Sequence, residues 1–139
     1  MVVYLNLQTT QTLIGYPVYT VNHILVIDDE KSVLHVIRLA LTRAGFEVEI
    51  APDGQKGIQK FEDGHFDLVI TDILMPGKDG RDVVKHIRSS TRSSTPIIGW
   101  SGTPWFLNES DFDAVFTKPF PLKDLVNTVR DLSLKAVAN

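Results

Sequence analysis

Residues 68–80, LVITDILMPGKDG, decide the fold of this chain. The apolar and β-branched run that begins at Leu68 is bounded by turn residues, which is typical of a buried strand. Asp72 therefore stands at the carboxyl end of the expected strand, where open α/β sheets bind ligands. An Asp that merely opens the turn before Met75-Pro76 is the alternative. The rest of the chain decides between the two.

Short apolar runs and amphipathic stretches alternate from His23 onward. The expected strands are residues 23–27, 46–50, 68–71, 97–100 and 113–117, and the expected helices cover residues 33–44, the stretch through Ile58 and Phe61 up to Gly64, residues 81–89, and the segment after Pro121. Such alternation predicts an α/β domain, a doubly wound sheet of five parallel strands with helices on both faces.

The connection between the last two strands is unusually short, since it spans only residues 102–113. A helix of roughly 11 residues and two loops of about 2–6 residues each do not fit there. We therefore expect a shortened fourth helix of at most a turn or two, beginning near Pro104. Three aromatic residues, Trp105, Phe106 and Phe112, would have to cover the sheet in its place.

The N-terminal segment differs in composition, because residues 1–22 contain no Asp, Glu, Lys or Arg. The β-branched and aromatic residues in 2–5 and 18–21 indicate strands or an extended arm. We therefore divide the chain into an N-terminal extension (1–22), a domain (23–135) and a C-terminal tail (136–139).

Composition limits the classes of function. The chain has 139 residues, with 14 Lys and Arg against 17 Asp and Glu, so it forms one domain without a broad attraction for nucleic acid or an anionic membrane. It contains no cysteine and no apolar run of about 18 residues, and its N-terminus does not have the pattern of a signal peptide. These features predict a cytoplasmic location with neither a nucleic-acid nor a membrane surface.

Polar residues follow four of the expected strands. They are Asp28 and Asp29, Asp72, Ser101 and Lys118. Each has a structural alternative, such as a helix cap, a turn or a surface corner. Because the carboxyl ends of parallel strands meet at one edge of the sheet, we expect all five to form one site.

Carboxylates that converge in one site repel each other. At about 4 Å and an effective dielectric constant near 20, one pair costs roughly 4 kcal/mol, so a proton or a cation must lie among them. Oxygen ligands without His or Cys suit Mg²⁺, and the four histidines form no spaced pair of the kind that binds zinc. A carboxylate can also act as the nucleophile in phosphoryl transfer, with Lys118 and Ser101 stabilising the phosphoryl oxygens.

Four motifs in this order resemble the receiver domain of two-component response regulators, the CheY-like members of the flavodoxin-like fold. They are ILVIDDE (24–30), ITDILMPGKDG (70–80), Ser101-Gly102 and FTKPF (116–120). The resemblance covers about residues 23–135 and implies a phosphoacceptor regulator that catalyses only its own phosphorylation and dephosphorylation. It also implies a sensor histidine kinase or histidine phosphotransfer protein as donor, and a downstream protein target.

The resemblance assigns a role to each residue of the site. Asp72 is the phosphoacceptor, and Asp28, Asp29, Asp72 and the backbone carbonyl of Leu74 hold Mg²⁺. Ser101 is the switch hydroxyl, and Lys118 pairs with the phosphate next to a cis bond to Pro119. A cis bond before proline is physically permissible.

Two features depart from the family pattern. Val115 occupies the position, three residues before the lysine, where receiver domains usually carry Tyr or Phe. Phe116 does not replace that aromatic residue, because neighbouring side chains along a strand point to opposite faces. The shortened fourth helix is the second departure. We hypothesise that the N-terminal extension covers the surface it leaves, within the chain or in a homodimer.

Two other classes of function compete with a regulator. A receiver-like binding module that acts without phosphorylation agrees with the altered switch, although all five site residues are present. A phosphatase with an Asp nucleophile would need an Asp-x-Asp pattern after the first strand. Asp28-Asp29-Glu30 occupies that place and does not match it.

Overall fold

The computed structural model describes residues 2–3, 10–12, 17–18, 22–102 and 111–138. Its main sheet has the strand order β5-β4-β6-β7-β8, and every pairing between neighbours is parallel. The strands are β4 (His23–Ile27), β5 (Glu47–Ala51), β6 (Leu68–Asp72), β7 (Ile97–Ser101) and β8 (Ala114–Thr117). This arrangement confirms the predicted five-stranded parallel sheet.

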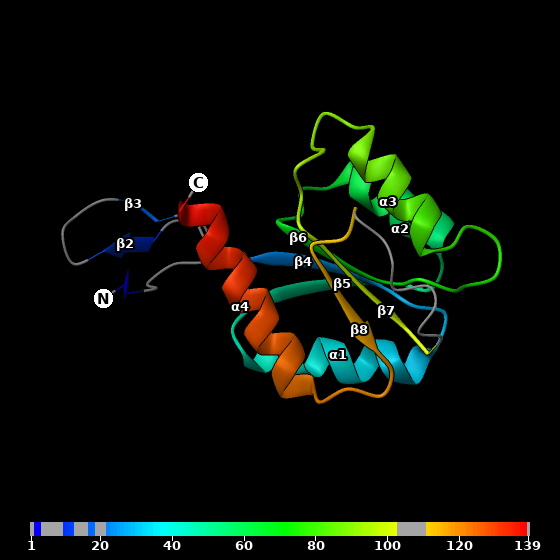
Figure 1. The fold of residues 1–139 in the computed structure, drawn as a ribbon, viewed down its shortest axis with the longest axis horizontal. Helices are drawn as coiled ribbons and strands as arrows, with labels where there is room; N and C mark the ends of the chain where they lie inside the picture. Colours follow the sequence, from blue (N-terminus) through cyan, green and yellow to red (C-terminus); the bar gives the residue numbers. More distant parts are fainter. Residues whose placement is uncertain (1, 4–9, 13–16, 19–21, 103–110, 139) are drawn as a thin grey trace.

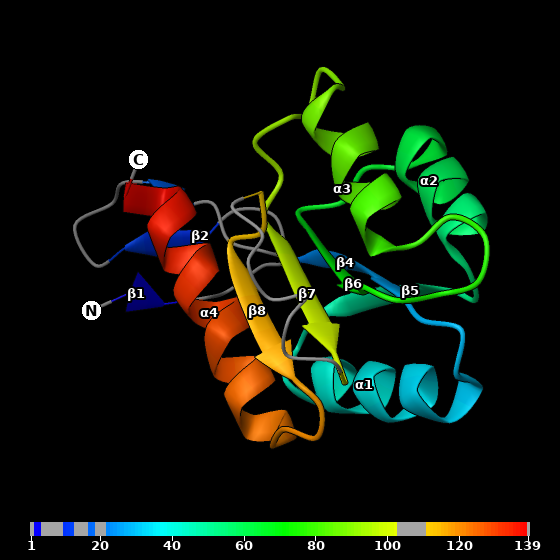
Figure 2. The same cartoon turned by 45° about the vertical axis from the view of Figure 1, so that its right-hand side comes forward.

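Helices cover both faces of the sheet, as predicted. They are α1 (Lys31–Arg43), α2 (Gly54–Asp63), α3 (Gly80–Arg88) and α4 (Leu122–Ala138). Helices α1 and α4 lie on one face, and α2 and α3 lie on the other (Figures 1 and 2). The side-chain alternation of the strands divides the apolar core accordingly. Ile24, Val26 and Ile70 pack with α1 and α4, whereas Leu25, Ile27 and Val69 pack with α2 and α3.

Helices α1, α2 and α3 begin earlier than the apolar spacing indicated, because their first residues are polar or glycine. Asp53 caps α2 by accepting a hydrogen bond from the Lys56 amide. Asp79 and Asp82 form a capping box that begins α3. Capping residues were therefore the signal for these boundaries, and hydrophobic periodicity marked only the buried turns that follow.

The short connection before β8 is described only at its C-terminal end. The expected short helix near Pro104, with Trp105 and Phe106, lies outside the described residues. Phe112 does pack against the sheet as predicted: a Cβ atom on Gly99 would lie 2.6 Å from its ring. Gly99 therefore leaves the space that Phe112 occupies.

Arg88, at the end of α3, ties this connection to its surroundings. Its guanidinium donates to the carbonyl oxygens of Ser93, Thr95 and Asp111 and to the carboxylate of Asp113. That carboxylate also accepts from the Ile97 amide at 2.8 Å. One side chain therefore joins α3, the loop before β7 and the residues that lead into β8.

The N-terminal extension forms a separate antiparallel sheet of three short strands, β1 (Val2–Val3), β2 (Thr10–Thr12) and β3 (Pro17–Val18). Strands were expected near its two ends, but the central strand was not predicted. In both views this sheet lies beside the C-terminal end of α4 (Figures 1 and 2). Whether this small sheet covers the surface left by the shortened helix expected near Pro104, which is not α4, stays a prediction. The boundaries of the N-terminal extension and of the C-terminal tail stay predictions as well. The described residues contain no helix long and apolar enough to span a membrane.

We predict that Arg88→Lys lowers the free energy of unfolding by about 2–3 kcal/mol in urea denaturation, because lysine cannot reproduce several charge-assisted hydrogen bonds made in different directions. Arg81→Lys is the matched control. Its side chain is 48% exposed, against 24% for Arg88, and pairs with Asp79 at the surface, so we expect a loss below about 1 kcal/mol. Equal losses in the two variants would contradict the proposed anchoring role of Arg88.

Candidate functional site

The carboxyl ends of the central strands bring the predicted acidic residues together. Asp28 follows β4 and is fully buried, Asp72 ends β6 and is 5% exposed, and Asp29 is exposed. One carboxylate oxygen from each of the three lies within 4.8 Å of the others. The predicted convergence of these acids at one edge of the sheet is therefore present in the structure.

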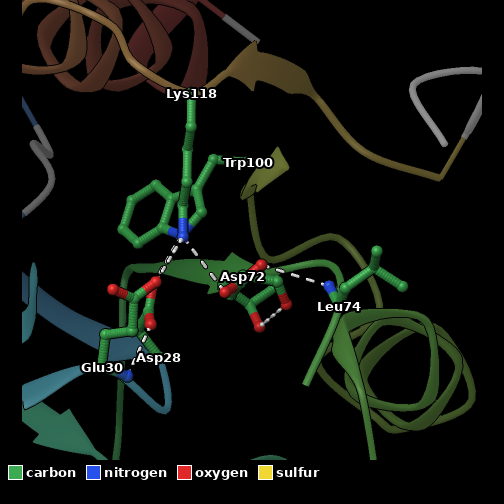
Figure 3. Close-up of polar contacts among 7 residues, drawn as sticks. Asp28, Glu30, Asp72, Leu74, Trp100 and Lys118 are labelled. Atoms are coloured by element: carbon green, nitrogen blue, oxygen red, sulfur yellow. Dashed lines mark hydrogen bonds and ion pairs between the residues drawn. The ribbon is translucent and has the colours of Figure 1, made fainter. Parts of the chain in front are cut away.

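Backbone groups of the following loop hold Asp72 in place. The Leu74 amide donates to Asp72 Oδ1 at 3.1 Å (Figure 3). Gly80 packs directly against the carbonyl of Asp72, so that a side chain at this position would collide with it, and its amide donates to the Ile73 carbonyl at 3.0 Å. The LMPGKDG turn thus fixes the strand end that carries the central carboxylate.

Lys118 is the cation that joins the two buried carboxylates. Its Nζ lies 3.2 Å from Asp72 Oδ2 and 3.3 Å from Asp28 Oδ2, and 3.7 Å from the exposed Glu30 (Figure 3). The Lys118 amide donates to the Ser101 carbonyl at 2.8 Å, which aligns the start of the loop after β8 with the end of β7. The bond between Lys118 and Pro119 is cis, as expected.

Two residues of the site were missed as contributors. Trp100 Nε1 donates to Asp28 Oδ2 at 2.8 Å within the core. Trp100 fits the apolar strand pattern, which hides its polar contact, although its place directly before Ser101 indicates that it approaches the same edge. Glu30 belongs to the quoted ILVIDDE motif, but no role was given to it. Its amide donates to Asp28 Oδ1 at 2.9 Å.

The side chains of Val115 and Phe116 in β8 point to opposite faces of the sheet, as predicted. Phe116 packs in the core on the α1 and α4 side. Its ring centroid lies 4.8 Å from that of Phe120, and the Phe120 centroid lies 5.8 Å from that of Trp100. Val115 pairs with Gly99 in the ladder and belongs to the opposite face. Phe116 therefore does not take the usual aromatic position. Ser101 is fully buried, and its function as a switch hydroxyl remains a prediction.

The electrostatics of the site show a shortage of positive charge. Burial and the neighbouring Asp28 raise the pKa of Asp72 from 3.8 to about 6, although Lys118 and the Leu74 amide oppose this. Burial also acts to lower the pKa of Lys118, but the two carboxylates outweigh it and raise that pKa above 10.5. One ammonium group therefore does not fully compensate the acids around it.

The donor set suits Mg²⁺. The converging groups are carboxylate oxygens, and the raised pKa of Asp72 shows that additional positive charge would be favourable there. Asp28, Asp29 and Asp72 are in place to hold such an ion. The predicted contribution of the Leu74 carbonyl stays a prediction.

Sequence comparison gives a consistent assignment. Residues 24–130 match the family model described as the response regulator receiver domain. The chain is 32% identical over 114 residues to the transcriptional regulatory protein TrcR of Mycobacterium tuberculosis, a match that covers 78% of this chain and 44% of TrcR. It is also 32% identical to ResD of Bacillus subtilis, over 81% of this chain and 48% of ResD. The chain therefore spans about half the length of these curated relatives.

Solved structures agree with this assignment. The response regulator TrrA of Thermotoga maritima, in complex with Mg²⁺-BeF, is 31% identical and superposes with a TM-score of 0.74, over 80% of this chain and 98% of TrrA. The chemotaxis protein CheY4 of Vibrio cholerae is 29% identical with a TM-score of 0.72, over 84% of this chain and 98% of CheY4.

We predict that Asp72→Asn stabilises the metal-free protein by about 1–3 kcal/mol at pH 8, measured by urea denaturation with EDTA. A carboxyl whose pKa rises from 3.8 to about 6 on folding contributes stability that is complete below pH 3.8 and is lost as the pH rises through 6. The uncharged Asn avoids this loss. The gain should therefore shrink as the pH falls from 8 toward 4.

Asp131→Asn is the control for this measurement, because Asp131 is exposed on α4 and we expect a change within about 0.5 kcal/mol. A variant Asp72→Asn that is no more stable than the wild type at pH 8 would show that Lys118 already compensates the site.

Proposed function

This chain belongs to the family of response regulator receiver domains, and on that premise we propose that Asp72 accepts a phosphoryl group from a phosphohistidine. The chain is a regulatory domain of two-component signalling. The observation that carries the proposal is the position of Lys118 Nζ, 3.2 Å from Asp72 and 3.3 Å from Asp28 at the carboxyl edge of the sheet.

The chemistry follows from the carboxylate. An oxygen of ionised Asp72 supplies the electron pair that forms the new O–P bond, while the N–P bond of the phosphohistidine breaks and its pair returns to the imidazole nitrogen. With a pKa of about 6, most Asp72 is ionised at pH 7 even without a cation. The anchored strand end and the Leu74 amide orient this carboxylate.

Positive charge is what the transfer requires from the remaining residues, because the charge of the reaction resides on the phosphoryl oxygens. We propose that Lys118 shifts from its present carboxylate partners to a phosphoryl oxygen and that the Ser101 hydroxyl donates to another. Bound Mg²⁺ would supply further charge neutralisation. Asp28, Asp29, Asp72 and the Leu74 carbonyl are the groups proposed to hold it.

The proposed partners follow from the same chemistry. A sensor histidine kinase or a histidine phosphotransfer protein would donate the phosphoryl group, and a downstream protein would respond to the modified domain. We propose a cytoplasmic location, where such donors act, and a domain that catalyses only its own phosphorylation and dephosphorylation. Any homodimer would involve the N-terminal extension.

We predict that intact-mass spectrometry detects the addition of one phosphoryl group after incubation with Mg²⁺ and acetyl phosphate, and that chelation of Mg²⁺ with EDTA abolishes it. Asp72→Asn should remain unmodified, because its amide is not a nucleophile for this transfer. Asp79→Asn is the matched control, since Asp79 caps α3 and takes no part in the site. It should be modified like the wild type.

Absence of modification with acetyl phosphate and also with a phosphorylated sensor kinase would overturn this function. It would favour the alternative, a receiver-like module that binds its partner without phosphorylation. Modification that persists in Asp72→Asn would instead move the acceptor to another residue.

A further inference from the structure

Trp100 makes an unusual polar contact for a residue of the central core. The side chains of Trp100 and Asp28 are both fully buried, and the indole Nε1 donates to Asp28 Oδ2 at 2.8 Å. The ring packs among apolar residues of the α1 and α4 side and lies 5.8 Å from the Phe120 ring. A buried indole N–H needs an acceptor, and here that acceptor is a carboxylate of the proposed metal site.

The hydrogen bonds of Asp28 are distributed unequally between its two oxygens. Oδ2 accepts from both Trp100 and Lys118, at 2.8 and 3.3 Å. Oδ1 accepts from the Glu30 amide at 2.9 Å. Because each carboxylate oxygen can accept about two hydrogen bonds, Oδ1 keeps accepting capacity whereas Oδ2 is saturated.

The two donors on Oδ2 also differ in how firmly they are held. Lys118 is shared with Asp72 and Glu30 and is 24% exposed. Trp100 is held in the sheet, since its carbonyl accepts from the Ile73 amide at 2.8 Å and its ring is enclosed by the core. An indole can only donate. The Trp100 N–H would therefore keep its hydrogen bond to Asp28 if Lys118 moved toward another anion.

We propose that Trp100 is a positioning residue for the phosphoacceptor site. Its N–H holds the Asp28 carboxylate in one orientation independently of Lys118, so that Oδ1 remains the oxygen of Asp28 available to Mg²⁺. This inference rests on the proposed function and adds a residue to it. Any acceptor in the core would satisfy a buried indole N–H, but here the acceptor is a carboxylate of the proposed metal site.

The test measures the Mg²⁺ dissociation constant of the full chain by NMR titration of backbone amides in wild type and Trp100→Phe. We expect Trp100→Phe to weaken binding about tenfold, the lower end of the range for partners that orient metal ligands. Ile98→Val is the matched control. Ile98 is fully buried in the same core cluster and on the same strand but is not a partner of Asp28, so we expect a change below about twofold.

A second pair of variants tests whether Trp100 acts through Asp28. If it does, Trp100→Phe should change the Mg²⁺ affinity by less than about twofold when Asp28→Ala is already present. A tenfold loss that persists in Asp28→Ala would assign the effect to packing and overturn the inference. So would a Trp100→Phe protein that binds Mg²⁺ like the wild type.

The indole proton of the unmodified protein gives an independent readout should Trp100→Phe fold poorly. We expect its ¹H–¹⁵N signal, identified as the indole signal that Asp28→Ala displaces, to exchange slowly with water before and after saturation with Mg²⁺. Fast exchange in both states would overturn the inference. A wild-type chain that binds no Mg²⁺ would instead overturn the proposed function itself, whereas normal wild-type binding with unaffected Trp100→Phe would remove only the role of Trp100.

Discussion

The site depends on one ammonium group shared by two buried carboxylates. Lys118 lies within 3.3 Å of both Asp28 and Asp72, which have almost no exposure to solvent. A single cation cannot neutralise both acids, and burial together with the neighbouring Asp28 raises the pKa of Asp72 despite Lys118. A second cation at this edge would offset the remaining negative charge, because a buried charge without a partner is costly.

The sheet makes this arrangement possible. Asp28, Asp72 and Lys118 come from chain positions as far as 90 residues apart, and only the parallel register of β4, β6, β7 and β8 brings their strand ends to one edge. Strands β4 and β6, which lead to Asp28 and Asp72, are buried almost throughout. The free energy gained by burying those strands therefore offsets the cost of the unfavourable charge at their ends.

Sequence reasoning could predict the fold and the acids because both have local signals. Alternating apolar runs indicate the strands, and the residue that follows each run lies at the functional edge, so Asp72 and Lys118 could be placed without coordinates. For Trp100, the position directly before Ser101 indicates only that the residue approaches this edge, and not that its N–H reaches Asp28. Its apolar ring satisfies the strand pattern, while the direction of its N–H depends on the neighbouring strand and on Asp28, which is 72 residues away in sequence.

The departures at the switch and the contact of Trp100 concern the two faces of β7 and β8. On one face, Val115 pairs with Gly99, and Phe112 fills the space that Gly99 leaves. On the other face, Trp100, Phe116 and Phe120 form an aromatic group beneath Lys118. The aromatic residues closest to Lys118 therefore lie on the face that packs against α1 and α4. Lys118 and the Trp100 indole donate to the same oxygen, Asp28 Oδ2. A movement of Lys118 away from Asp28 would therefore change the hydrogen bonding of this aromatic group directly.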